Sequence, residues 1–154
     1  MNALPRRSFL SALLASLPFA ACRPPSEGEI GPSLAPAELA ARLAAVKEGK
    51  IAVLYVGPAA LFERGHVPGA RDVGEVSTEA GRRALESTLA ALPKETEVVL
   101  YCGCCPVANC PNVRPASAMI RASGRPNGRV LDLPTRFATD WADKGYPVAR
   151  GRES

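Results

Sequence analysis

The sequence predicts an α/β fold, in which a central and mostly parallel sheet is flanked by helices to give three layers. Short apolar runs at 51–56 and 97–101 lack a strict alternation of apolar and polar residues, which is typical of strands buried on both faces. Segments with helical spacing separate these runs, so strands and helices alternate along the chain. About 115 residues lie between the amino-terminal segments and a short tail, which is enough for one domain with its own core.

The first half of this domain is predicted to contain two helices, two strands and a helical turn. In chain order these are a helix over 36–48, a strand over 51–56, a helical turn over 59–64, a brief strand over 71–73 and a helix ending at residue 92. The first helix ends before Gly49, a residue that commonly follows a helix. Ser77 or Thr78 supplies the side-chain oxygen that caps the second helix.

The second half continues the alternation. A strand over 97–101 leads to Cys102, a helix over 114–122 is closed by a glycine, a strand covers 129–133, and a last helix runs from Thr135 to residue 144. Thr135 is expected to cap that last helix. Phe137 and Trp141 lie four residues apart, so both are expected to face the core.

The amino terminus has the pattern of an export signal. Within residues 1–21, Arg6 and Arg7 precede an apolar run over 8–19 that is too short for a membrane span. The paired arginines resemble a twin-arginine signal, and the residues before Cys22 resemble a bacterial lipobox, which implies lipidation of Cys22. The alternative is a plain secretory signal that leaves Cys22 as an ordinary thiol. We therefore expect an exported protein, periplasmic or anchored to the membrane as a lipoprotein.

Composition limits the partners. Residues 22–35 are rich in Pro, Gly and Ser and are expected to form a flexible tether. The net charge of +4 falls to +2 without residues 1–21, so charge gives no reason to expect nucleic-acid binding.

Four of the five cysteines fall within residues 102–110, between a predicted strand and a predicted helix. In an α/β sheet, functional sites form beyond the carboxyl ends of the strands. The N–H groups and dipole of a helix N-terminus stabilise a thiolate, so this position favours thiol chemistry. Cys102 lies at such a strand end.

Three segments, in this order, resemble the rhodanese-like domain family. They are Gly-His-Val-Pro-Gly-Ala at 65–70, Val-Val-Leu-Tyr-Cys at 98–102, and Trp-Ala-Asp-Lys-Gly-Tyr-Pro-Val at 141–148. The resemblance implies the three-layer rhodanese-like fold over 36–149, followed by a tail at 150–154.

The resemblance also implies an activity. Members of the family transfer sulfane sulfur by way of a cysteine persulfide, and Cys102 matches the position of that nucleophile. Arg114 stands where the family places an arginine at the end of the loop, a group suited to bind an anionic donor. The implied partners are a small sulfur donor and an acceptor molecule or protein, and the implied sulfurtransferase needs no cofactor.

The other loop cysteines leave alternatives open. Eleven residues separate Cys102 from Arg114, more than the family loop contains, and three of them are Cys104, Cys105 and Cys110. These three thiols are consistent with a stapling disulfide, with a resolving thiol that attacks a Cys102 persulfide, or with a site for zinc, copper(I) or an iron–sulfur cluster. The chain as a whole is then a sulfur carrier, a metal-binding module or a thiol–disulfide protein.

The remaining polar residues are assigned structural or surface roles. His66 is the only histidine and lies in the Gly-x-Val-Pro-Gly turn, so we expect it to be structural. Arg82, Arg83, Arg121 and Arg125 are expected to be solvated surface charges.

Overall fold

A five-stranded parallel sheet forms the centre of the structure, a computed structural model that describes residues 29–152. The strands are β1 (Ser33–Leu34), β2 (Ile51–Tyr55), β3 (Arg71–Asp72), β4 (Glu97–Tyr101) and β5 (Gly128–Leu131). Their order across the sheet is β1-β5-β4-β2-β3, and every neighbouring pair is parallel. The predicted α/β class with a parallel sheet is therefore confirmed.

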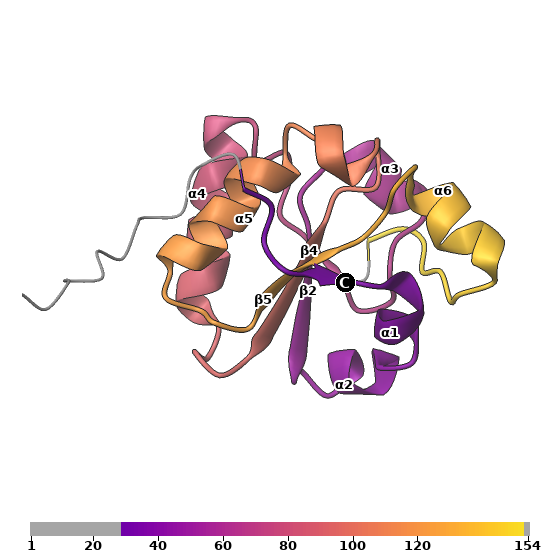
Figure 1. Cartoon of the computed structure of the whole chain (residues 1–154), viewed down its shortest axis with the longest axis horizontal. Helices are drawn as coiled ribbons and strands as arrows, with labels where there is room; N and C mark the ends of the chain where they lie inside the picture. The colour runs from indigo at the N-terminus through magenta and orange to yellow at the C-terminus, as the bar shows by residue number, and fades with distance from the viewer. Residues whose placement is uncertain (1–28, 153–154) are drawn as a thin grey trace, which may run out of the picture.

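The helices cover both faces of this sheet. They are α1 (Pro36–Ala40), α2 (Leu43–Lys47), α3 (Ala59–Arg64), α4 (Glu79–Ala91), α5 (Val113–Ala122) and α6 (Phe137–Asp140), with 3₁₀ turns η1 (Val107–Asn109) and η2 (Ala142–Lys144). Helices α4 and α5 lie on one side, and α1, α2, α3 and α6 lie on the other (Figure 1).

Each face has its own apolar cluster because successive residues of a strand point to opposite sides. On β4, Val98 and Leu100 pack toward α4 and α5, whereas Val99 and Tyr101 pack toward α1, α3 and Trp141. Cys102 continues the first set, so the strand period itself directs its side chain to the α4–α5 face. The burial of Trp141 is confirmed, since its side chain is fully enclosed.

The predicted helix over 36–48 is interrupted. The Arg42 N–H bonds the Leu39 carbonyl three residues back, and the Arg42 backbone (φ −112°, ψ 15°) lies outside the helical region. The Arg42 guanidinium reaches across to the Glu97 carboxylate at the start of β4. Two short helices replace one long helix at this point.

The predicted start of the last helix is also wrong. Helix α6 begins at Phe137, and the Asp140 carboxylate accepts the N–H groups of Thr135 and Arg136, at 2.6 and 2.9 Å. Helix α6 has no side-chain cap; the carboxylate of its last residue instead holds the two residues before the helix, and Thr135 contributes its backbone only. By contrast, Thr78 caps α4 as predicted, because its Oγ1 accepts the Gly81 N–H at 3.1 Å.

Two further differences concern residues expected to be in solvent. Arg125 is 4% exposed and donates to the carbonyl oxygens of Leu89, Leu92 and Pro93 at the end of α4. Strand β1 falls within 22–35, the predicted tether, where residues 33 and 34 pair with β5. Residues 1–28, which include the predicted signal and Cys22, lie outside the described residues.

His66 is buried and structural, as predicted. Its Nδ1 lies 2.8 Å from the Phe62 carbonyl, and its ring stacks on Phe62 with centroids 3.7 Å apart. Within the described range, none of the helices has both the length and the apolar character needed to span a bilayer.

Candidate active site

Cys102 follows β4 directly, at the carboxyl end of a strand inside the sheet. The residue is 2% exposed and belongs to the core cluster on the α4–α5 side. Gly57, which follows β2, makes room for it, because a Cβ added there would lie 2.7 Å from the Cys102 Sγ. The thiol is therefore held by the frame of the sheet as well as by its own loop.

Sulfur atoms converge around Cys102. Its Sγ lies 3.1 Å from the Cys104 Sγ, and the Cys104 Sγ lies 3.4 Å from the Cys105 Sγ. The Sγ atoms of Cys102, Cys104 and Cys110 all lie within 4.8 Å of one another. All four loop cysteines are free thiols in this structure.

Backbone contacts hold the loop in place. Gly103 has a φ of +74°, a region that glycine enters at little cost, and its carbonyl accepts the Phe137 N–H at 3.0 Å. The Val107 N–H bonds the Leu133 carbonyl at 3.1 Å. The loop is thereby tied to the segment that follows β5.

Asn112 joins the loop to the start of α5. It is 3% exposed, its Oδ1 accepts the Ser77 N–H at 2.8 Å, and its Nδ2 points to the Cys102 Sγ at 3.8 Å. A buried amide with a partner at each end fixes the position of the groups around it.

The thiols differ in acidity. A hydrogen bond from the Cys102 thiol, followed by bonds from the backbone N–H groups of Asn112 and Val113, lowers the pKa of Cys110 to about 5. The pKa of Cys102 is raised, first because it donates to Cys110 and then because it is buried. Burial raises the pKa of Cys105 to about 12. The hydrogen bonds around Cys110 thus favour its thiolate, whereas Cys102 is favoured as a thiol.

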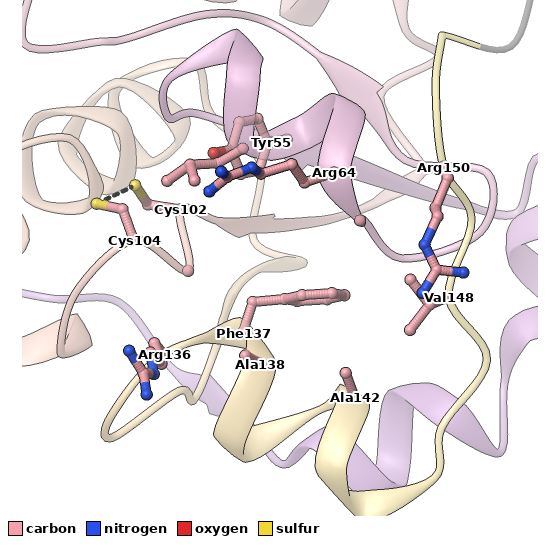
Figure 2. Close-up of a pocket in the computed structure, with 13 residues that line it drawn as sticks. Tyr55, Arg64, Cys102, Cys104, Arg136, Phe137, Ala138, Ala142, Val148 and Arg150 are labelled. Carbon is pink, nitrogen blue, oxygen red and sulfur yellow. Dashed lines mark hydrogen bonds between the residues drawn. The ribbon is translucent and has the colours of Figure 1, made fainter.

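A pocket of about 360 Å³ is lined at one end by Cys102 and Cys104 (Figure 2). Arg64, Arg136 and Arg150 stand around it, from the end of α3, the segment before α6 and the carboxyl-terminal segment. Among the described residues that line the pocket, none is an aspartate or glutamate. The pocket therefore presents positive charge beside the thiols and suits an anion.

Apolar side chains form the rest of the wall, with Phe137, Leu61 and Val148 among them. The Tyr55 hydroxyl also lines the pocket and donates to the Pro58 carbonyl at 3.0 Å. Burial raises the pKa of Tyr55, so this hydroxyl stays neutral.

Arg114 lies elsewhere. Its guanidinium donates to the Ala108 carbonyl at 2.7 Å, and its side chain lines a separate hollow with Arg82 and Met119. It is not among the residues that line the pocket at Cys102. The substrate role predicted for Arg114 stays a prediction, and its visible contact is with the loop backbone.

The structure brings the four predicted loop cysteines together and adds residues that the sequence did not single out. These are Asn112 and the three pocket arginines. Asn112 carried a weak signal, because asparagine is common next to a helix start. The three pocket arginines carried no such signal in the sequence, because each belongs to a different segment and only the fold brings them to one edge of the sheet.

Comparison with known proteins identifies relatives of this arrangement. A family model described as the rhodanese-like domain matches residues 35–133. No curated protein matches the chain.

Several solved structures share the fold at low sequence identity. The rhodanese-like domain of the Alr3790 protein from Anabaena sp. is 20% identical with a TM-score of 0.55, over 79% of this chain and 80% of that one. The BH2092 protein from Bacillus halodurans is 22% identical with a TM-score of 0.59, over 77% of each chain. The EanB/T414V chain, from a structure of its complex with hercynine, is 20% identical to this chain with a TM-score of 0.58. The match covers 82% of this chain and 29% of the EanB chain.

Proposed function

Because this chain belongs to the rhodanese-like domain family, we propose that it transfers sulfane sulfur through a persulfide on Cys102. One observation carries the proposal. Cys102 lies at the carboxyl end of β4, where it lines a pocket that Arg64, Arg136 and Arg150 also line. A nucleophile beside an anion-binding pocket is what attack on a small sulfur anion requires.

The transfer consists of two displacements. As the anionic donor binds beside the pocket arginines, Cys102 loses its proton to water. The Cys102 thiolate attacks the sulfane sulfur, the bond between that sulfur and the leaving group breaks, and the leaving group departs with the electron pair. With thiosulfate the leaving group is sulfite. A nucleophilic acceptor then takes the outer sulfur of the persulfide, and the thiol is regenerated without any net oxidant.

The arginines define the donor as an anion. Guanidinium groups form charge-assisted hydrogen bonds with oxyanions, and Arg64, Arg136 and Arg150 all line this pocket. We propose that they hold the oxyanion end of the donor while its sulfane sulfur points to Cys102.

A second function, thiol–disulfide exchange, is favoured by the 3.1 Å separation of the Cys102 and Cys104 sulfurs. In that reaction one of the two thiols attacks the disulfide of a partner and the other resolves the mixed disulfide. The partner is reduced and a Cys102–Cys104 disulfide forms.

We place this activity in the cell envelope. The proposal rests on the export pattern at residues 1–21 and on Cys22. Its test is the mass of the mature amino-terminal peptide, which carries acyl chains if Cys22 is lipidated and begins near that residue without them if the signal is plainly secretory.

The test of sulfur transfer uses reduced, metal-free protein incubated with thiosulfate. Intact mass should show a species heavier by one sulfur atom, and cyanide should remove that sulfur as thiocyanate. Cys102→Ser should abolish both signals. Cys105→Ser is the matched control, because it removes a thiol from the same loop and should retain transfer. Equal loss in both variants, or wild-type protein that never gains sulfur, would count against the persulfide.

A second test concerns the arginines. Arg136→Ala and Arg64→Ala should each raise the KM for thiosulfate about ten-fold, since a hydrogen bond to a charged group contributes about 1.5–3 kcal/mol. Arg114→Ala is the comparison. If Arg114→Ala raises the KM and the other two leave it unchanged, the anion is held by the loop arginine and not by the pocket.

A further inference from the structure

The loop brings together more sulfur than a single nucleophile needs. Cys102, Cys104 and Cys110 form a triangle whose Sγ atoms all lie within 4.8 Å of one another. Two of these atoms are 3.1 Å apart, closer than the ~3.5–4.0 Å optimum even for smaller carbon atoms. Sulfurs bound to one metal ion by bonds of ~2.3 Å lie ~4 Å apart, so the triangle already has nearly the size that a shared ion requires.

The donor atoms select the kind of metal. In the part of the chain that the structure describes, this group consists of cysteines alone and includes no histidine or carboxylate. Thiolates bind soft ions such as Cu(I) and Zn(II), whereas Mg(II) and Ca(II) prefer oxygen. His66, the single histidine of the chain, faces the Phe62 carbonyl on the opposite side of the sheet.

The number of sulfurs separates the two soft ions. The Cys105 thiol is hydrogen-bonded to Cys104, at 3.4 Å between the sulfurs, and to Cys110, but its Sγ is not part of the group whose sulfurs are all mutually close. A structural zinc site is closed by four ligands in a tetrahedron. Three sulfurs in a triangle instead match a soft monovalent ion of low coordination number.

The surroundings of the triangle offset its negative charge. The backbone N–H groups of Asn112 and Val113 point to Cys110, at the N-terminus of the ten-residue helix α5. The Asn112 Nδ2 points to the Cys102 Sγ. Oriented amides of this kind stabilise anionic groups, including a thiolate complex with a net negative charge. Two of the three ligands are buried, at 2% exposure for Cys102 and 1% for Cys110, so most of the site lies out of solvent.

We propose that Cys102, Cys104 and Cys110 bind one Cu(I) ion in a trigonal site. Binding joins the ion to three sulfurs and releases the thiol protons, and no oxidation state changes. The site includes Cys102, so copper and sulfane sulfur compete for it. That competition rests on the proposed sulfur transfer, whereas the metal site itself does not.

The experiment titrates full-length mature protein, fully reduced and free of oxygen, with Cu(I) in competition with a coloured Cu(I) chelator. One ion per chain should be withdrawn from the chelator. Loss of a residue that only orients a ligand already costs about 10–100-fold in affinity, so Cys102→Ser, Cys104→Ser and Cys110→Ser should each weaken binding by at least about a hundredfold. Cys105→Ser is the matched control and should bind as the wild type does.

X-ray absorption of the copper-loaded wild type gives a test that needs no variant. Three sulfur neighbours support the trigonal site. Four sulfur neighbours, or an equal loss of affinity in Cys105→Ser, would overturn it, and so would failure of the wild type to withdraw copper from the chelator.

The metal site and the sulfur transfer fail in different ways. Metal binding is measured without a sulfur donor, and sulfur transfer is measured on metal-free protein. Copper binding without persulfide formation would support the metal site and contradict the proposed function, whereas persulfide formation without copper binding would do the reverse. If both hold, the copper-loaded protein should gain no sulfur from thiosulfate until a chelator removes the ion.

Discussion

At the scale of single residues, the active thiols depend on the residue that follows Cys102. Gly103 turns the chain at a φ of +74°, and this turn directs the loop back so that Cys104 meets Cys102. A Cβ added at Gly103 would lie 2.8 Å from the Phe137 Cβ, so this glycine is required by its conformation and by close packing.

The first prediction concerns Gly103→Ala. The left-handed conformation costs a residue with a Cβ roughly 1–2 kcal/mol, and the contact with Phe137 adds to that cost. We expect the free energy of unfolding to fall by about 2–3 kcal/mol and sulfur transfer to fall with it, as measured by urea denaturation and thiocyanate formation.

Gly145→Ala is the matched control, because Gly145 has a φ of +78° but no atom within 4 Å of an added Cβ. In this variant the free energy of unfolding should fall only by the cost of the left-handed conformation, about 1 kcal/mol, and sulfur transfer should be fully retained. A similar loss of stability and activity in both variants would show that the contact with Phe137 does not matter.

The acidity of the thiols is also decided at this scale. The family resemblance led us to expect the nucleophile at Cys102, directly after the strand. The amides at the start of α5 reach Cys110 instead, because Cys110 is the loop cysteine nearest to that helix in the chain. The role of Cys102 as the nucleophile stays a prediction.

At the scale of elements, helix ends account for most differences between expectation and structure. Patterns of apolar residues predicted α4 and α5 well, and the cap at Thr78 was read from its position alone. The ends of α1 and α6 depend on distant or later residues. The Arg42 side chain reaches Glu97, and the Asp140 carboxylate holds the backbone just before α6.

The second prediction concerns the end of α4. Arg125 donates to three carbonyl oxygens there and is 4% exposed, so Arg125→Ala leaves carbonyls without a partner in the interior. We expect the free energy of unfolding to fall by about 3 kcal/mol, measured by urea denaturation.

Arg83→Ala provides the comparison on the same helix. Its ion pair with Glu79 is exposed, at 72% and 79%, and exposed pairs contribute about 0–1 kcal/mol. If the two arginine variants lost equal stability, the capping role of Arg125 would be refuted.

At the scale of the whole molecule, charged side chains join α1, β4 and β5 at the edge opposite the thiols. Glu97 accepts two hydrogen bonds from Arg42, at 3.0 and 2.5 Å, and lies 3.9 Å from Arg129. The hydrogen bond from Arg42 is the main reason why the pKa of Glu97 is lowered. This cluster links the first helix to the centre of the sheet.

The third prediction follows from that pKa. Because the pKa of Glu97 is lower in the folded state, its stabilising effect is present above the unfolded value of about 4.3 and is lost as pH falls through the folded value. Glu97→Gln should therefore lower the free energy of unfolding by about 1 kcal/mol at neutral pH and by much less in acid. Urea denaturation at the two pH values measures this difference.

Glu79→Gln is the control for this effect, since the Glu79 carboxylate is 79% exposed. The free energy of unfolding of Glu79→Gln should differ little from that of the wild type at every pH. If Glu97→Gln lost as much stability in acid as at neutral pH, the loss would come from packing and not from charge.

By itself, the sequence determined the order of strands and helices, the parallel sheet and the location of four thiols at the end of β4. These features depend on local spacing, because the periods of strands and helices and the signals at their ends involve residues close together in the chain. The tertiary structure alone decided that the pKa of Cys110 is lowered, that Arg125 is buried, and that Arg64, Arg136 and Arg150 share one pocket with Cys102. Parallel strands bring the segments after them to the same edge of the sheet, so contacts between those segments depend on three-dimensional packing that no local pattern records.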